Sequence, residues 1–164
     1  MPRQHGDMDR ITRIVLLCVV AGCAPNPVPG TEEYDRGMQE MRAGLDRAWD
    51  GVAVLQTELG STDGRDQIGS GLDMMHSGAL MMEEGLEMMG SGWTNSHGCH
   101  GHAPDLAAPV ADDLATLDDV HQGMMDDDEA DDGEHLVHFE NELHEFEHHL
   151  DAMELEMECM RHHR

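Results

Sequence analysis

Residues 64–85 read GRDQIGSGLDMMHSGALMMEEG, with a glycine at every seventh position. The same spacing occurs earlier, in residues 37–51, which read GMQEMRAGLDRAWDG. An apolar residue follows most of these glycines, and another apolar residue lies three positions further on. This is the heptad pattern of packed helices, with glycine repeated on one flank of each helix.

A glycine inside a helix costs about 1 kcal/mol relative to alanine, so the repeat predicts a compensating contact. Glycine lets two helix backbones approach more closely than the usual ~8–10 Å. The sequence therefore predicts a tight antiparallel hairpin of helices over about residues 32–59 and 63–91. Symmetry about a turn at Ser61 predicts three facing glycine pairs: Gly51 with Gly71, Gly44 with Gly78, and Gly37 with Gly85.

Two further helices are predicted from apolar residues at spacings of three and four. The first, about residues 105–125, has an apolar face of Val110, Leu114, Leu117, His121 and Met124. The second, about residues 134–160, has a face of Leu136, Phe139, Leu143, Phe146, Leu150, Met153, Met157 and Met160. Four amphipathic helices with short connections predict an all-α fold, an up-down-up-down four-helix bundle over residues 32–164.

The charge of the chain is strongly one-sided. It has 35 acidic residues against nine basic ones, all of them arginine, for a formal net charge of −26. Such a surface repels nucleic acid and concentrates cations near the protein. We therefore expect no nucleic-acid partner.

The N-terminal segment has the order of a secretory signal. Arg10 and Arg13 precede a short apolar run, which ends in Val20-Ala21-Gly22-Cys23. This ending resembles the lipobox of bacterial lipoproteins. The resemblance implies that residues 1–22 are a signal peptide and that Cys23 is lipidated and anchors the chain to a lipid bilayer. The absence of aspartate after Cys23 implies an outer-membrane lipoprotein that faces the periplasm or the cell surface.

Residues 23–31 carry the lipidated cysteine and a proline-rich tether of the semi-rigid kind. Outside the cytoplasm, two remaining cysteines are expected to form a disulfide bond. In an up-down-up-down bundle, Cys99 and Cys159 lie at the same end and can meet. The alternative is that Cys99 is a metal ligand.

Two clusters between residues 74 and 102 are candidate metal ligands. His97, His100 and His102, with Cys99, fall within six residues separated by glycines, and could surround one copper or zinc ion. Thioethers suit Cu(I), and a stripe of methionines follows the glycine repeat: Met74, Met81 and Met88. Without a metal, the histidine cluster would be a polar loop and the methionine stripe would be part of the packed core.

The last two helices supply the other candidate ligands. His144 and His148 lie four residues apart on one exposed face, where they could chelate a divalent ion or simply face solvent. His121 falls on an apolar face, where it is either satisfied by a hydrogen bond or joins methionines in a buried site. A non-covalent haem bound by one methionine and one histidine, as in bundle cytochromes of the b type, is a further variant of that site; the chain has no Cys-x-x-Cys-His motif for covalent haem attachment.

The sequence thus predicts an anchored extracytoplasmic protein that binds copper, as Cu(I) or Cu(II), or a similar ion such as zinc, for buffering or detoxification. Its composition resembles that of methionine- and histidine-rich periplasmic metal-binding proteins. The alternative is a structural or interaction lipoprotein without a ligand, and a haem-binding bundle is a distant third. No nucleophile has a recognisable base partner and no phosphate-binding glycine loop occurs, so we do not expect an enzyme.

Overall fold

The computed structural model describes residues 28–90, 103–126 and 132–162. They form four helices, α2 (Thr31–Thr57), α3 (Thr62–Met89), α4 (Ala103–Asp126) and α5 (Asp132–His162). The all-α prediction is confirmed, and each predicted helix end lies within two residues of the observed one. None of these helices is both long and apolar enough to cross a bilayer.

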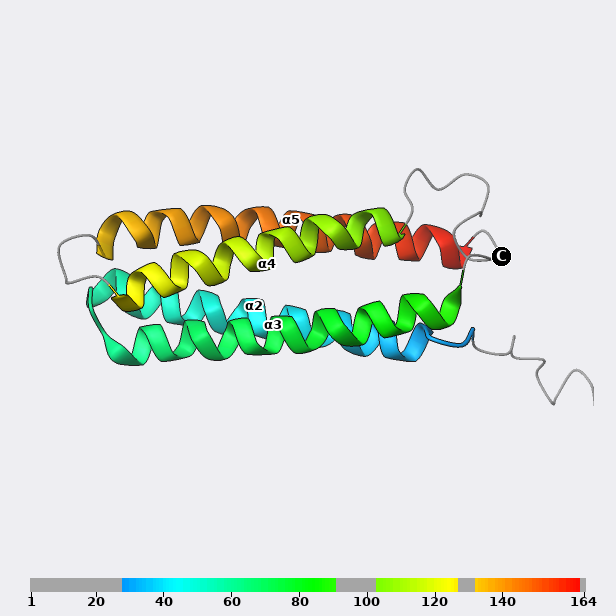
Figure 1. Cartoon of the computed structure of the whole chain (residues 1–164), viewed down its shortest axis with the longest axis horizontal. Helices are drawn as coiled ribbons and strands as arrows, with labels where there is room; N and C mark the ends of the chain where they lie inside the picture. Colours follow the sequence, from blue (N-terminus) through cyan, green and yellow to red (C-terminus); the bar gives the residue numbers. More distant parts are fainter. Residues whose placement is uncertain (1–27, 91–102, 127–131, 163–164) are drawn as a thin grey trace, which may run out of the picture.

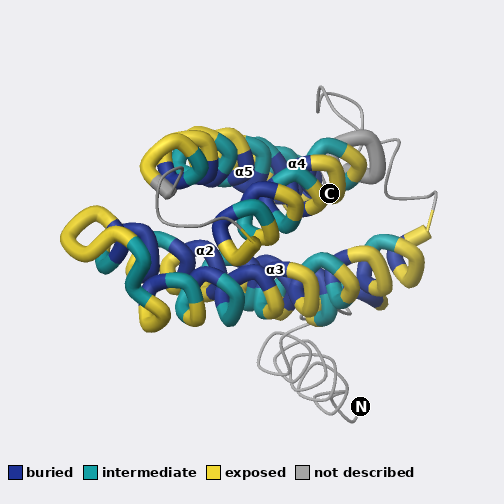
Figure 2. Tube along the Cα trace, turned by 60° about the vertical axis from the view of Figure 1, so that its left-hand side comes forward, coloured by how far each residue is buried: buried dark blue, intermediate teal, exposed yellow. Residues whose placement is uncertain are grey.

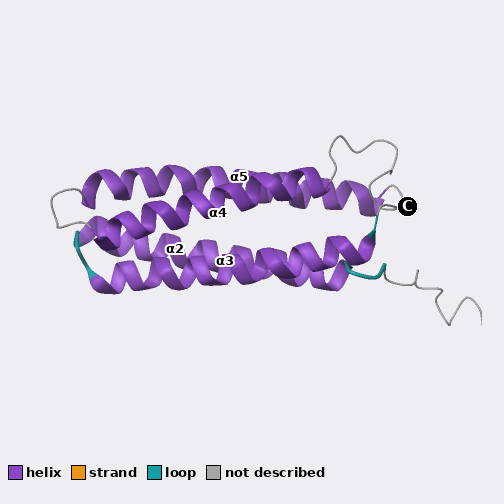
Figure 3. Ribbon diagram, viewed as in Figure 1, coloured by secondary structure: helices purple, strands orange, loops and turns teal. Residues whose placement is uncertain are grey.

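The helices are arranged as two antiparallel hairpins, α2–α3 and α4–α5, stacked on each other (Figures 1 and 3). Each helix contacts the one before and after it in the chain, and α2 also contacts α5. The bundle is therefore up-down-up-down, as predicted. As a result, α2 and α4 begin at the end of the bundle where α3 and α5 finish.

The turn between α2 and α3 is short and ends in a glycine with left-handed backbone geometry. Gly60 has a φ of 83°, a conformation that costs glycine nothing and disfavours residues with a side chain. The Ser61 amide donates a hydrogen bond to the Glu58 carbonyl at 3.1 Å, which closes the turn. The turn is thus centred before Ser61, between Thr57 and Thr62.

The glycine seam exists, but its predicted register is wrong by one heptad. Gly51 faces Gly64, Gly44 faces Gly71, and Gly37 faces Gly78. Gly30 extends the series by facing Gly85. The physical reason is the early turn: equal repeats fit several registers, and a turn centred before Ser61 brings each glycine to the partner one heptad closer to the turn.

The seam is a contact between backbones. A Cβ atom built on Gly44 would lie 2.6 Å from the Gly71 carbonyl oxygen, and one built on Gly71 would lie 2.6 Å from the Gly44 oxygen. Side chains of the facing helix also lie against several of these glycines: the Cγ of Met75 lies over Gly44 and the Cγ of Met41 over Gly78. Side chains such as these therefore fill the space that glycine leaves open.

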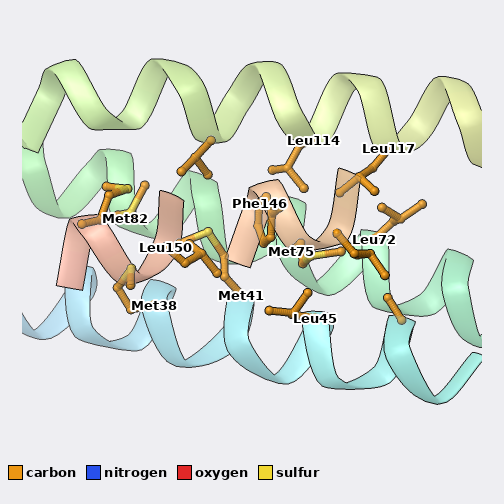
Figure 4. Packing of buried hydrophobic residues seen from close by; sticks show 14 of the residues in the cluster. Met38, Met41, Leu45, Leu72, Met75, Met82, Leu114, Leu117, Phe146 and Leu150 are labelled. Atoms are coloured by element: carbon orange, nitrogen blue, oxygen red, sulfur yellow. The ribbon is translucent and has the colours of Figure 1, made fainter. Parts of the chain in front are cut away.

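The core runs the length of the bundle between the two hairpins, and buried residues recur along all four helices (Figure 2). Leucine and phenylalanine dominate the half nearest the α2–α3 turn. The other half, at the end where α2 begins and α5 finishes, is the methionine-rich end: Met38, Met41, Met82, Met89, Met153, Met157 and Met160. Figure 4 shows the transition, with Met38, Met41 and Met82 on one side and Leu45, Leu72 and Leu117 on the other.

Candidate functional site

Several predicted site residues lie outside the residues that the structure describes. These are the lipidation site Cys23 and the histidine-rich connection between α3 and α4 with His97, Cys99, His100 and His102. They stay predictions from the sequence. The predicted disulfide between Cys99 and Cys159 is described at one end only. Cys159 is disulfide-bonded, and the other cysteines, Cys18, Cys23 and Cys99, all fall outside the described residues.

The methionine stripe of α3 borders the glycine seam. Met74 and Met81 are half-buried, Met88 is 43% exposed, and the Cβ of Met88 lies against Gly30. Neighbours in the stripe are seven residues apart, which is about 10.5 Å along a helix. An ion bound by one of these thioethers therefore needs its other ligands from elsewhere.

His121 is half-buried and faces the backbone of α3. Its Nε2 lies 3.2 Å from the carbonyl oxygen of Arg65, and its ring occupies the space left by the absent side chain of Gly69. The hydrogen-bonded interpretation is the one that this geometry favours. A haem ligand would need the same nitrogen to face a cavity.

His144 and His148 lie on the exposed face of α5, one helical turn apart. The His144 ring is also in contact with α2, where its centroid lies 4.7 Å from that of Trp49. Its Nδ1 is 3.8 Å from a carboxylate oxygen of Glu147. His144 and His148 are thus both exposed to solvent, and Trp49 lies beside His144, where its fluorescence can report on changes at that ring.

Two histidines that are not among the predicted site residues connect the helices. His149 Nδ1 lies 2.6 Å from the carboxylate of Asp113 on α4, which is almost fully buried. His76 Nε2 lies 2.7 Å from the Asp118 carboxylate and connects α3 to α4. Since the partners are distant in sequence, spacing along one helix carried no signal for either contact.

Within the described ranges, no three histidine, cysteine, aspartate or glutamate side chains converge as they would around a metal ion. A described site built from these residue types can therefore supply two protein ligands, with water or another ligand completing the coordination.

A groove of about 580 Å³ runs between α2 and α5 at the methionine-rich end. This α2–α5 groove is lined by Tyr34, Asp35, Met38 and Gln39 of α2 and by Glu154, Met157, Glu158 and Arg161 of α5. Its floor is formed by Tyr34, Met38 and Met157, which are all buried. A second groove, of about 410 Å³, lies between α3 and α4 and is lined mainly by alanine and leucine side chains.

The Tyr34 hydroxyl is buried and has no hydrogen-bond partner in the part of the chain that is described. Burial raises the pKa of this phenol well above its ordinary value of 10.0; Arg161 lowers it, and Asp35 and Glu154 raise it further. All three of those charged residues line the α2–α5 groove, as Tyr34 itself does. The sequence analysis missed Tyr34, although it continues the seven-residue series that contains Met41.

Tyr34 is the only tyrosine of the chain, so an alkaline absorbance titration reports on it alone. Because the pKa is raised in the folded state, the unfolded chain releases the proton first, and stability is lost as the pH rises above about 10. We expect phenolate absorbance to appear together with loss of the helical circular dichroism signal. The variant Tyr34→Phe should lose stability less steeply in this range. Ionisation near pH 10 with intact helices would contradict a buried phenol.

Comparison of the chain with protein-family models, with curated proteins and with solved structures finds no match.

Proposed function

We propose that this chain is a lipid-anchored extracytoplasmic protein that binds copper or a similar soft or borderline cation, for buffering or detoxification. The observation that carries the proposal is the pair His144 and His148 on the exposed face of a bundle helix. Imidazole suits Cu(II) and Zn(II), and the net charge of −26 raises the concentration of cations around the pair. The histidine-rich connection with His97, His100 and His102 is the second proposed site.

The proposed location is supported by two features of the chain. The lipobox-like ending at Cys23 would anchor the N-terminus in the outer membrane, and α2 begins at Thr31, a short proline-rich tether away. The disulfide bond of Cys159 fits an oxidising compartment. The anchor would hold the methionine-rich end of the bundle close to the membrane surface.

A structural or interaction lipoprotein is the competing function, and one observation favours it. Methionines such as Met41 and Met75 pack over seam glycines, where their apolar volume has a structural use. On this alternative the histidines are only surface groups. Titration with Cu(II) distinguishes the two functions.

The chain has two tryptophans, and each lies near one proposed site. Trp49 contacts His144, and Trp93 precedes His97 by four residues in the sequence. We expect Cu(II) at micromolar concentration to quench Trp49 fluorescence in full-length Trp93→Phe protein in detergent. Substitution of both His144 and His148 by alanine should abolish this quenching, because it removes the two imidazole ligands.

The matched control removes two other exposed histidines, His76 and His138, and should leave the quenching of Trp49 unchanged. In Trp49→Phe protein, quenching of Trp93 that is lost on alanine substitution of His97, His100 and His102 would identify the second site. If neither tryptophan responds to Cu(II), both histidine sites are wrong. If the chain also fails to bind Ag(I), the metal-binding function is wrong and the structural alternative stands.

A further inference from the structure

The contacts between α2 and α5 hold the two helices in one register. Gln56 donates to Glu140 at 2.8 Å, Arg42 donates to Glu154 at 3.2 Å, and Arg161 pairs with Asp35. Between successive contacts, each step toward the start of α2 equals the step toward the end of α5. The register therefore places Met38 opposite Met157 and Glu158, between the two arginine bridges.

The α2–α5 groove opens over this position. Met38 and Met157 line it and are 8% and 2% exposed, so their thioethers form its floor and not its rim. Tyr34 completes the floor, and its buried hydroxyl has no hydrogen-bond partner among the described residues. The floor of the groove therefore carries two thioether sulfurs, from Met38 and Met157, and one phenolic oxygen, from Tyr34.

The charged residues of the groove favour a soft ion over a hard one. The carboxylates of Asp35 and Glu154 are engaged by Arg161 and Arg42, and no cluster of three carboxylate, imidazole or thiolate ligands occurs among the described side chains. Hard cations prefer several carboxylate or carbonyl oxygens, whereas thioethers select Cu(I) and similar soft ions. Among the residues that line the groove, Met38 and Met157 supply the soft ligands.

We propose that the α2–α5 groove binds one soft monovalent cation of the Cu(I) class, with the thioether sulfurs of Met38 and Met157 as ligands. This site rests on the proposed function. It adds a thioether site for the monovalent ion, which the histidine pair and the connecting loop do not supply. Two thioethers leave the ion with an open coordination position. A water or small anion in that position is the missing hydrogen-bond acceptor for the Tyr34 hydroxyl.

The test uses Ag(I), which has the charge and closed d shell of Cu(I) and does not require a reductant. Full-length protein in detergent and chloride-free buffer, labelled with ¹³C at the methionine methyl groups, is titrated while the methyl resonances are recorded. We expect the Met38 and Met157 resonances to shift together with the first equivalents. Met75 and Met124, which are buried outside the groove, should not shift.

Leucine substitutions test the ligands without emptying the core, because methionine and leucine have similar volumes. Changing both Met38 and Met157 to leucine should weaken Ag(I) binding at least about tenfold. The control with Met75 and Met124 changed to leucine should bind as the unmodified chain does. Circular dichroism checks that both variants are equally helical.

Two results would overturn the inference, and they differ in what else they affect. If Ag(I) binds while the methyl resonances of Met38 and Met157 stay in place, the groove site is wrong and the proposed metal-binding function stands. If neither Ag(I) nor Cu(II) binds anywhere on the chain, the groove site and the proposed function are both wrong.

Discussion

Replacing Gly44 by alanine should lower the free energy of unfolding by about 3 kcal/mol, which is the usual range for overpacking in a tight interior. The added Cβ would lie 2.6 Å from the Gly71 carbonyl oxygen and 2.8 Å from the Met75 amide nitrogen, both of them backbone atoms. Neither can move without separating α2 from α3. Helix propensity alone predicts the opposite sign, a gain of about 1 kcal/mol.

Gly133 supplies the matched control, because it lies in the first turn of α5 with nothing within 4 Å of its Cβ position. Gly133→Ala should be neutral or stabilising by up to about 1 kcal/mol. Urea denaturation followed by circular dichroism measures both variants. Equal stabilisation by the two substitutions would mean that α2 and α3 do not meet along a glycine seam.

The four helices could be predicted because their signals are local. A heptad repeat with glycine at one fixed position in α2 and α3, and apolar spacings of three and four in α4 and α5, determine where each helix lies. Their order and short connections then determine the up-down-up-down topology. The register of α2 on α3 was not predictable in this way. Shifting one helix by seven residues along the other again places glycine opposite glycine, so the repeat alone does not distinguish the two registers.

Contacts between helices distant in sequence were the part that periodicity could not supply. His149 lies one helical turn from Glu145 on α5, but its Nδ1 contacts Asp113 on another helix. The groove between α2 and α5 depends in the same way on bridges such as that of Arg42 with Glu154, more than a hundred residues apart. No pattern within either helix indicates such a pairing.

His121 shows what sequence reasoning can do for one residue. Its place on an apolar face predicted either a hydrogen bond or a buried ligand role, and the backbone of α3 offers the hydrogen bond. What the sequence did not indicate is that Gly69, outside the seven-residue series, provides the space for the ring. Gly123 does the same for His135, so two isolated glycines accommodate histidine rings of neighbouring helices.

Replacing Phe146 by alanine should cost about 3–5 kcal/mol, as is typical when a fully buried phenylalanine is truncated. The ring is completely buried in the middle of the core, where Figure 4 shows it between Leu150 and Leu117. The two hairpins have no glycine seam between them, and polar bridges and core side chains hold them together. Loss of the ring should therefore weaken the contact between the hairpins more than the contact within α2–α3.

Native-state hydrogen exchange tests this distribution, because local opening is reported amide by amide. In Phe146→Ala, amides of α4 and α5 should exchange faster than those along the seam of α2 and α3. Leu155→Ala is the control on the same helix, since Leu155 is 69% exposed and should change stability by less than about 0.5 kcal/mol. Uniform loss of protection over all four helices would show that the bundle opens as one unit, and the seam would then have no separate stability.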